Sequence, residues 1–71
     1  MCVSLPGMVV SVQGPVAVVE TAGLTRRANA MMFPELAPGD RVLVHAGRVV
    51  RTLTAAEAQE IEAAFAELGV L

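Results

Sequence analysis

The chain contains one thiol, that of Cys2, and one imidazole, that of His45. Cys2 has no second cysteine to form a disulfide with, and a single thiol cannot complete a zinc site. Cysteine is small enough for the initiator Met1 to be removed, which would leave the thiol beside an α-amino group whose positive charge favours the thiolate. A thiolate and a neutral imidazole together form an incomplete ligand set for a transition metal. Taken singly, such a cysteine is more often an inert terminal thiol, and such a histidine an ordinary hydrogen-bonded residue.

Length and composition predict one small domain with an aliphatic core. A chain of 71 residues is near the lower limit for folding without disulfides or metals. Hydrophobic residues make up 55% of it, yet Phe33 and Phe65 are the only aromatic residues. The core is therefore expected to consist of Val, Leu, Ala and Met, and part of this apolar supply is expected to face a partner.

Charge and hydropathy exclude several classes of function. The five basic residues are all arginines and are outnumbered by seven acidic residues, so the basic face and stacking aromatics of a nucleic-acid-binding protein are missing. No basic segment precedes an apolar run, and no apolar run approaches the roughly 20 residues of a membrane span. We expect a cytoplasmic protein with a reduced thiol and no membrane or nucleic-acid partner.

Five short β-strands are predicted over residues 8–12, 15–20, 24–29, 41–46 and 48–53. Glycine-containing turns separate the first three strands, which implies a meander of hairpins. A longer connection over residues 30–40 ends in the turn-forming triplet Pro38-Gly39-Asp40. Five such strands fit a small, partly open barrel of the OB type, and strand count alone fits an SH3-like barrel nearly as well.

The last segment, residues 54–69, is predicted to be an amphipathic helix. Thr54 and Glu57 have the spacing of a capping box at its start, and Gly69 is a plausible stop at its end. Apolar residues recur at helical spacing along one side, namely Ala58, Ile61, Phe65 and Leu68. We expect this stripe to pack on the barrel or on a partner.

Two segments carry a family resemblance. They are Met1-Cys2-Val3-Ser4-Leu5-Pro6-Gly7 and Asp40-Arg41-Val42-Leu43-Val44-His45-Ala46-Gly47. With the chain length, the mid-chain arginine pair and the helical tail, they resemble the HypC/HupF/HoxL family of nickel–iron hydrogenase maturation chaperones. The likeness covers nearly the whole chain and favours the OB-like barrel. Ser4, Met8 and Arg48 differ from the residues that are frequent in the family.

The resemblance implies a chaperone that helps assemble an Fe(CN)2CO unit and deliver it to the large-subunit precursor of a nickel–iron hydrogenase. The implied partners are that precursor and a HypD-type iron–sulfur scaffold protein. The Cys2 thiolate is implied as a ligand of the transient iron and as a contact to the scaffold, with His45 as a candidate second ligand. We expect no enzymatic activity, because one thiol and one imidazole without paired acids are too little for a self-contained active site.

Further residues are candidates for contact with a partner, namely Pro6, Gly7, Arg26, Arg27, Met31 and Met32. The Pro-Gly pair restricts the backbone and would aim the N-terminal segment. The arginine pair suits carboxylates on a partner, or is simply exposed on its strand. The methionines, followed by Phe33, belong to the core or form an adaptable docking surface.

Two other functions fit the same residues. One is a small-barrel protein-binding module with an inert Cys2 and no metal transfer, for example a protein that protects the hydrogenase large subunit from oxygen. The other is a thiol enzyme in which Cys2 is the nucleophile and His45 the base.

Overall fold

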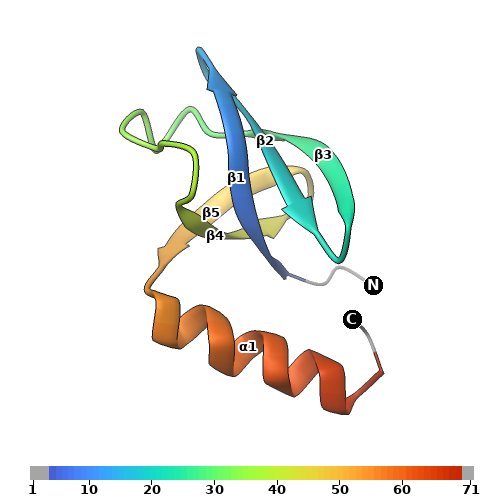
Figure 1. The fold of residues 1–71 in the computed structure, drawn as a ribbon. Helices are drawn as coiled ribbons and strands as arrows, with labels where there is room; N and C mark the ends of the chain where they lie inside the picture. Colours follow the sequence, from blue (N-terminus) through green and yellow to red (C-terminus); the bar gives the residue numbers. More distant parts are fainter. Residues whose placement is uncertain (1–3, 70–71) are drawn as a thin grey trace.

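The computed structural model describes residues 4–69, which form five strands and one helix (Figure 1). The elements are β1 (Leu5–Gln13), β2 (Val16–Thr21), β3 (Leu24–Asn29), β4 (Arg41–His45), β5 (Arg48–Leu53) and α1 (Ala55–Glu67). The mainly β class with a C-terminal helix, predicted from the sequence, is confirmed. β1 begins at Leu5 and not at the predicted Met8, because the residues before Met8 pair with β4.

The strands close into a barrel in the order β1-β2-β3-β5-β4. The antiparallel β1–β2 and β2–β3 hairpins confirm the predicted meander. β4 pairs antiparallel with both β1 and β5. β3 meets β5 in parallel at one residue pair, Asn29 opposite Arg48, so the ring closes most weakly there. The position of β5 between β3 and β4 gives a Greek-key arrangement, which OB-type barrels share.

A tight turn at Ala46 and Gly47 joins β4 to β5. Both residues have positive φ angles, 53° and 76°, which is the backbone of a type I′ hairpin turn. This turn type matches the twist of the strands, so β4 and β5 stay paired up to His45 opposite Arg48. The turn thereby sets the position of the only imidazole in the chain.

The barrel interior contains the Val, Leu and Ala side chains that the composition predicts. The largest fully buried side chains are those of Val9 and Val42. The expected contribution of methionine to the core is wrong for the described residues, because Met8, Met31 and Met32 are all exposed.

Close approach of β1 and β2 depends on Gly7, since a Cβ there would overlap Val19 Cγ1 and lie 2.7 Å from Thr21 Oγ1. A glycine at position 7 is therefore a packing requirement of the barrel.

The helix α1 covers one side of the barrel and contacts β1, β4 and β5 (Figure 1). Ala58 is 1% exposed, and Ile61 and Phe65 are half-buried. Leu68 lies just beyond the helix as its C-cap and is 75% exposed, so the predicted stripe packs on the barrel only as far as Phe65. Within the described residues, no helix is long and apolar enough to span a bilayer.

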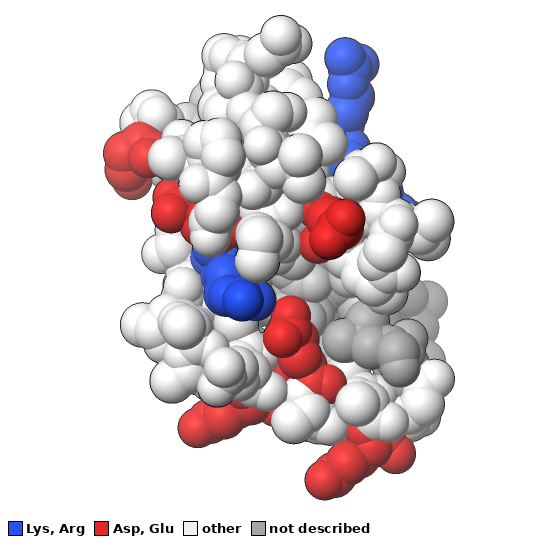
Figure 2. All heavy atoms as spheres, viewed as in Figure 1, with Lys and Arg blue, Asp and Glu red and all other residues white. Residues whose placement is uncertain are grey.

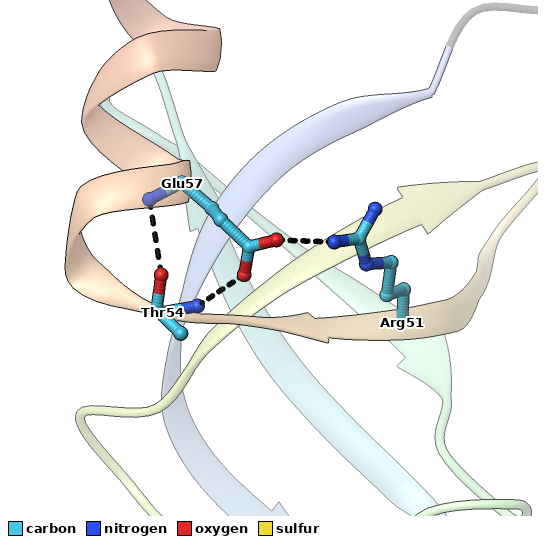
Figure 3. A network of polar contacts seen from close by, with 3 residues as sticks. All are labelled: Arg51, Thr54 and Glu57. Carbon is cyan, nitrogen blue, oxygen red and sulfur yellow. Dashed lines mark hydrogen bonds and ion pairs between the residues drawn. The ribbon is translucent and has the colours of Figure 1, made fainter.

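The predicted capping box is present at the start of α1 (Figure 3). The Glu57 N–H donates to Thr54 Oγ1 at 3.1 Å, and the Glu57 carboxylate accepts from the Thr54 N–H at 2.9 Å. Arg51 of β5 pairs with the same carboxylate. Further along the helix, Glu62 pairs with Arg41 of β4 at 3.6 Å. These contacts align the helix on β4 and β5.

Acid should weaken this helix start. The Thr54 N–H holds the pKa of Glu57 below its ordinary 4.5, with partial burial acting in the opposite direction and Arg51 adding to the lowering. A carboxyl whose pKa falls on folding stabilises the native state above its ordinary pKa, and this contribution is lost as the pH drops through the lowered value. We expect the thermal midpoint of the natural chain to fall more steeply below about pH 4.5 than that of Glu57→Gln.

Glu60→Gln provides the control, because Glu60 has no hydrogen bond or ion pair to the described side chains. It should keep the acid dependence of the natural chain. Identical dependence in all three proteins would mean that the Glu57 carboxylate is not linked to folding.

Truncation along the helix stripe should distinguish its packed part from its exposed end. Phe65→Ala is expected to lower the free energy of unfolding by about 1–2 kcal/mol, because its ring is only half-buried. Leu68→Ala should change it by less than about 0.5 kcal/mol, as is usual for an exposed site. Denaturant unfolding of both variants measures the difference. Equal losses would contradict the described exposure of Leu68.

Candidate functional site

His45, the last residue of β4, lies beside the start of β1. Its Nδ1 is 3.1 Å from Ser4 Oγ in a part-buried hydrogen bond. The contact follows from strand pairing, since Leu5 stands opposite Val44 and the next position along each strand brings Ser4 to His45. The two residues are 41 positions apart in the sequence, so only the closed barrel brings them together.

The hydrogen bond to Ser4 engages Nδ1 of His45, and the position of the ring proton decides whether Nε2 is available. When the Nδ1–H donates to Ser4 Oγ, the lone pair on Nε2 is free, and this is the form in which a histidine binds a metal. When the Ser4 hydroxyl donates instead, Nε2 carries the proton. Ser4 is thus the residue that can orient the imidazole.

Cys2, the source of the predicted thiolate, lies outside the described residues, as does Met1. Chain length nevertheless limits where a thiol at position 2 can be, because two residues span at most about 7 Å between Cα atoms. Ser4 is in contact with His45, so chain length permits a shared site of Cys2 and His45. Among residues 4–69, no group of three or more His, Cys, Asp or Glu side chains could hold a metal ion. A metal bound by His45 therefore needs further ligands from outside this range or from a partner.

A cavity of about 420 Å³ lies at the same end of the barrel as His45. It sits where β3 diverges from the β4–β5 hairpin. Its walls are mainly apolar and include Leu5, Val19, Leu24, Val44 and Ala46. Val44 and Ala46 are the sequence neighbours of His45, so the cavity and the imidazole share one strand end.

The predicted arginine pair is divided between two faces of β3. Arg26 stands opposite the buried Val19, which puts it on the inner face, whereas Arg27 stands opposite Val18 on the outer face. Both side chains are exposed, and both residues contribute to the lining of the cavity. Neither forms an ion pair with the described acidic side chains. Both remain predicted partner contacts.

The Met31-Met32-Phe33 run is also divided. Phe33 packs against the core, but Met31 and Met32 are 65% and 81% exposed. The two methionines are therefore surface residues and remain candidates for docking a partner. Pro6 and Gly7, by contrast, are buried within β1, where they pair with Leu43 and Val42.

Charge is distributed unevenly over the described surface. Acidic side chains gather on α1 in the lower part of Figure 2, and the helix contains four glutamates and no basic residue. At the hairpin end of the barrel, Arg48 stands opposite both His45 and Asn29. Arg48 beside His45, and Arg26 and Arg27 at the cavity, therefore border the candidate site in a chain whose net charge is −2.

Sequence reasoning missed two residues of this site. The sequence marks Ser4 only as a residue that is unusual in the family, and Leu24 only as the start of a predicted strand. Their signal is the strand register, which places Ser4 at His45 and Leu24, 59% exposed, at the cavity. No spacing within the sequence reveals that register.

The fold and the site define a small barrel protein whose single histidine is held beside its N-terminal segment. A family model described as the HupF/HypC family matches residues 1–65. The hydrogenase maturation factor HypC of Synechocystis sp. is 34% identical over 76 residues, which cover 99% of this chain and 100% of that protein. The chain therefore belongs to the HupF/HypC family, which confirms the resemblance seen in its sequence.

Removing the Ser4 hydroxyl should change the proton position on His45. A histidine that binds metal through Nε2 carries its proton on Nδ1, so ring ¹⁵N NMR of the natural chain should show mainly the Nδ1–H form when the imidazole is neutral. Ser4→Ala should shift the ring towards the tautomer mixture of a free imidazole, with a loss of stability of at most about 1.5 kcal/mol. Ser11→Ala, at an exposed serine of β1, is the matched control and should leave the ring signals unchanged. Identical tautomers in the Ser4→Ala variant would show that Ser4 does not orient His45.

Proposed function

We propose that this chain is a hydrogenase maturation chaperone that helps assemble an Fe(CN)2CO unit and deliver it to the large-subunit precursor. A HypD-type scaffold protein is the partner on which it receives the iron. Membership of the HupF/HypC family and the whole-length match to a curated hydrogenase maturation factor support this proposal. The observation that carries it is the contact between Ser4 and His45, since it holds the only imidazole within chain reach of Cys2.

In this proposal iron is cargo, and this chain supplies only two of its ligands. The Cys2 thiolate and the neutral imidazole of His45 are both suitable ligands for iron. Two donors leave coordination positions for groups of the scaffold and then of the precursor. A closed four-ligand cage would retain the metal, so an incomplete set fits a protein that passes it on.

The proposed partners have accessible surface to contact. Met31 and Met32 are exposed on the connection before β4, and Arg26 and Arg27 are exposed on β3. Unbranched methionines adapt to different surfaces, and arginines pair well with carboxylates. We propose that the chain acts by binding and not by catalysis, in the cytoplasm, where its thiol stays reduced.

Cys2→Ala is expected to abolish maturation without unfolding the protein. The thiolate is the donor that iron would lose, whereas a residue next to a chain terminus contributes little to stability. Hydrogenase activity in a deletion strain complemented with each variant measures the first effect, and the thermal midpoint of the purified chain measures the second. Ser11→Ala is the control and should complement fully. Natural activity from Cys2→Ala would remove the basis of the proposal.

Iron content distinguishes this function from a metal-free binding module that protects the large subunit from oxygen. Complexes purified under anaerobic conditions with the scaffold should contain iron when the chain is natural. With His45→Ala, the proposal requires a greater loss of iron than of bound scaffold. Iron-free complexes that still form normally would favour the binding module.

A further inference from the structure

One side of β3 is largely unpaired. β3 pairs with β2 along its whole length, from Leu24 opposite Thr21 to Asn29 opposite Val16. On its other side it meets β5 only at Asn29. Residues 24–28 thus have no strand partner on that side within the described chain. We call this open stretch of β3, together with the β4–β5 hairpin that faces it, the seam.

The backbone of β3 presents hydrogen-bonding groups to the seam. The Asn29 N–H donates across it to the Gly47 carbonyl oxygen at 2.9 Å. Backbone groups of a strand alternate between its two sides, so Arg27 and Thr25 direct their N–H and C=O groups the same way as Asn29. No backbone group of the described residues pairs with them across the seam. An unpaired edge of this kind is a template for another strand.

The seam also has features that select the side chains of an incoming strand. The cavity of about 420 Å³ lies along it, with Leu24 and Arg26 on its β3 wall. Three arginines border it, namely Arg26, Arg27 and Arg48, and none pairs with an acidic side chain of the described residues. Four of the acidic residues lie on α1, which packs on β1, β4 and β5, and Glu20 of β2 stands opposite Thr25 on the paired side of β3. The seam is thus suited to a segment with an apolar residue and a carboxylate.

We infer that a partner protein docks an extended, acidic segment on the open edge of β3, adding a strand to the barrel. Its backbone pairs with Thr25 and Arg27, an apolar side chain enters the cavity, and a carboxylate pairs with Arg26. The segment then lies along Val44 and Ala46, next to His45. The inference rests on the proposed function only for the identity of the partner, a scaffold or large-subunit precursor held beside the iron ligands.

Amide hydrogen exchange of the ¹⁵N-labelled chain tests this directly. The probes are short overlapping peptides that cover the sequences of the scaffold and of the large-subunit precursor, and the two full-length proteins. The amides of Thr25 and Arg27 should exchange rapidly in the free chain and become protected when a probe binds. The amides of Arg26 and Ala28, which point towards β2 by the same alternation, serve as internal controls and should be protected throughout.

Two variants of one residue separate backbone from side chain. Arg27→Pro deletes the seam-facing N–H while leaving the bonds to β2, and should weaken peptide binding at least about tenfold. Arg27→Ala keeps the N–H and loses the same charge, so it should bind more tightly than Arg27→Pro. Arg26→Ala should weaken binding at low salt and match the natural chain at high salt. If Arg27→Pro fails to fold, amide exchange at Thr25 of the natural chain, with and without the peptide, still tests whether a strand docks on β3.

The possible outcomes separate this inference from the proposed function. Protection of Thr25 and Arg27 by a peptide supports edge docking, even if no full-length partner binds and the proposed function fails. Binding of a full-length partner without that protection overturns edge docking and leaves the proposed function intact. Absence of all binding overturns both.

If the amides of Thr25 and Arg27 are already protected in the free chain, the inference that a partner segment occupies the edge of β3 is overturned. If dilution removes that protection, a second copy of the chain occupies the edge. If dilution does not, residues outside the described range occupy it.

Discussion

The pairing of β1 with β4 is the contact on which the rest of this structure depends. It joins the beginning of the described chain to its middle, with Leu5 opposite Val44. Such a long-range contact requires the entropy of a large loop to be lost before burial compensates for it. Val9 and Val42, each almost fully buried, supply part of that compensation. In a 71-residue chain with one cysteine, no disulfide assists this closure.

Both faces of this strand pair serve a purpose. The inner face forms the aliphatic core, and Gly7 lets β1 approach β2 without a steric clash. The other face supports α1, which contacts β1, β4 and β5. The same pairing brings Ser4 to His45, so the candidate site depends directly on barrel closure. Variants that loosen the barrel are therefore expected to disturb the imidazole as well.

The barrel closes extensively at β1–β4 and at only one residue pair between β3 and β5. A strand ring with one weak junction keeps its core while leaving backbone groups available for a partner. That junction lies beside the histidine and is bordered by arginines, whereas the helix is acidic. This separation of charge would orient an acidic partner towards the candidate site before contact. In the proposed function, docking and metal handover thus take place at one end of the molecule.

Local signals in the sequence were enough to predict the five strands and the capping box of Thr54 and Glu57, since turn geometry, capping and side-chain periodicity each act within a few residues. Overall composition predicted an aliphatic core, and motifs spread along the chain predicted the family. The tertiary structure alone decided the start of β1, the exposure of Leu68, the division of Arg26 and Arg27 between two faces, and the contact of Ser4 with His45. These features depend on the register of strands that are distant in the chain, and register follows from which arrangement buries the core best.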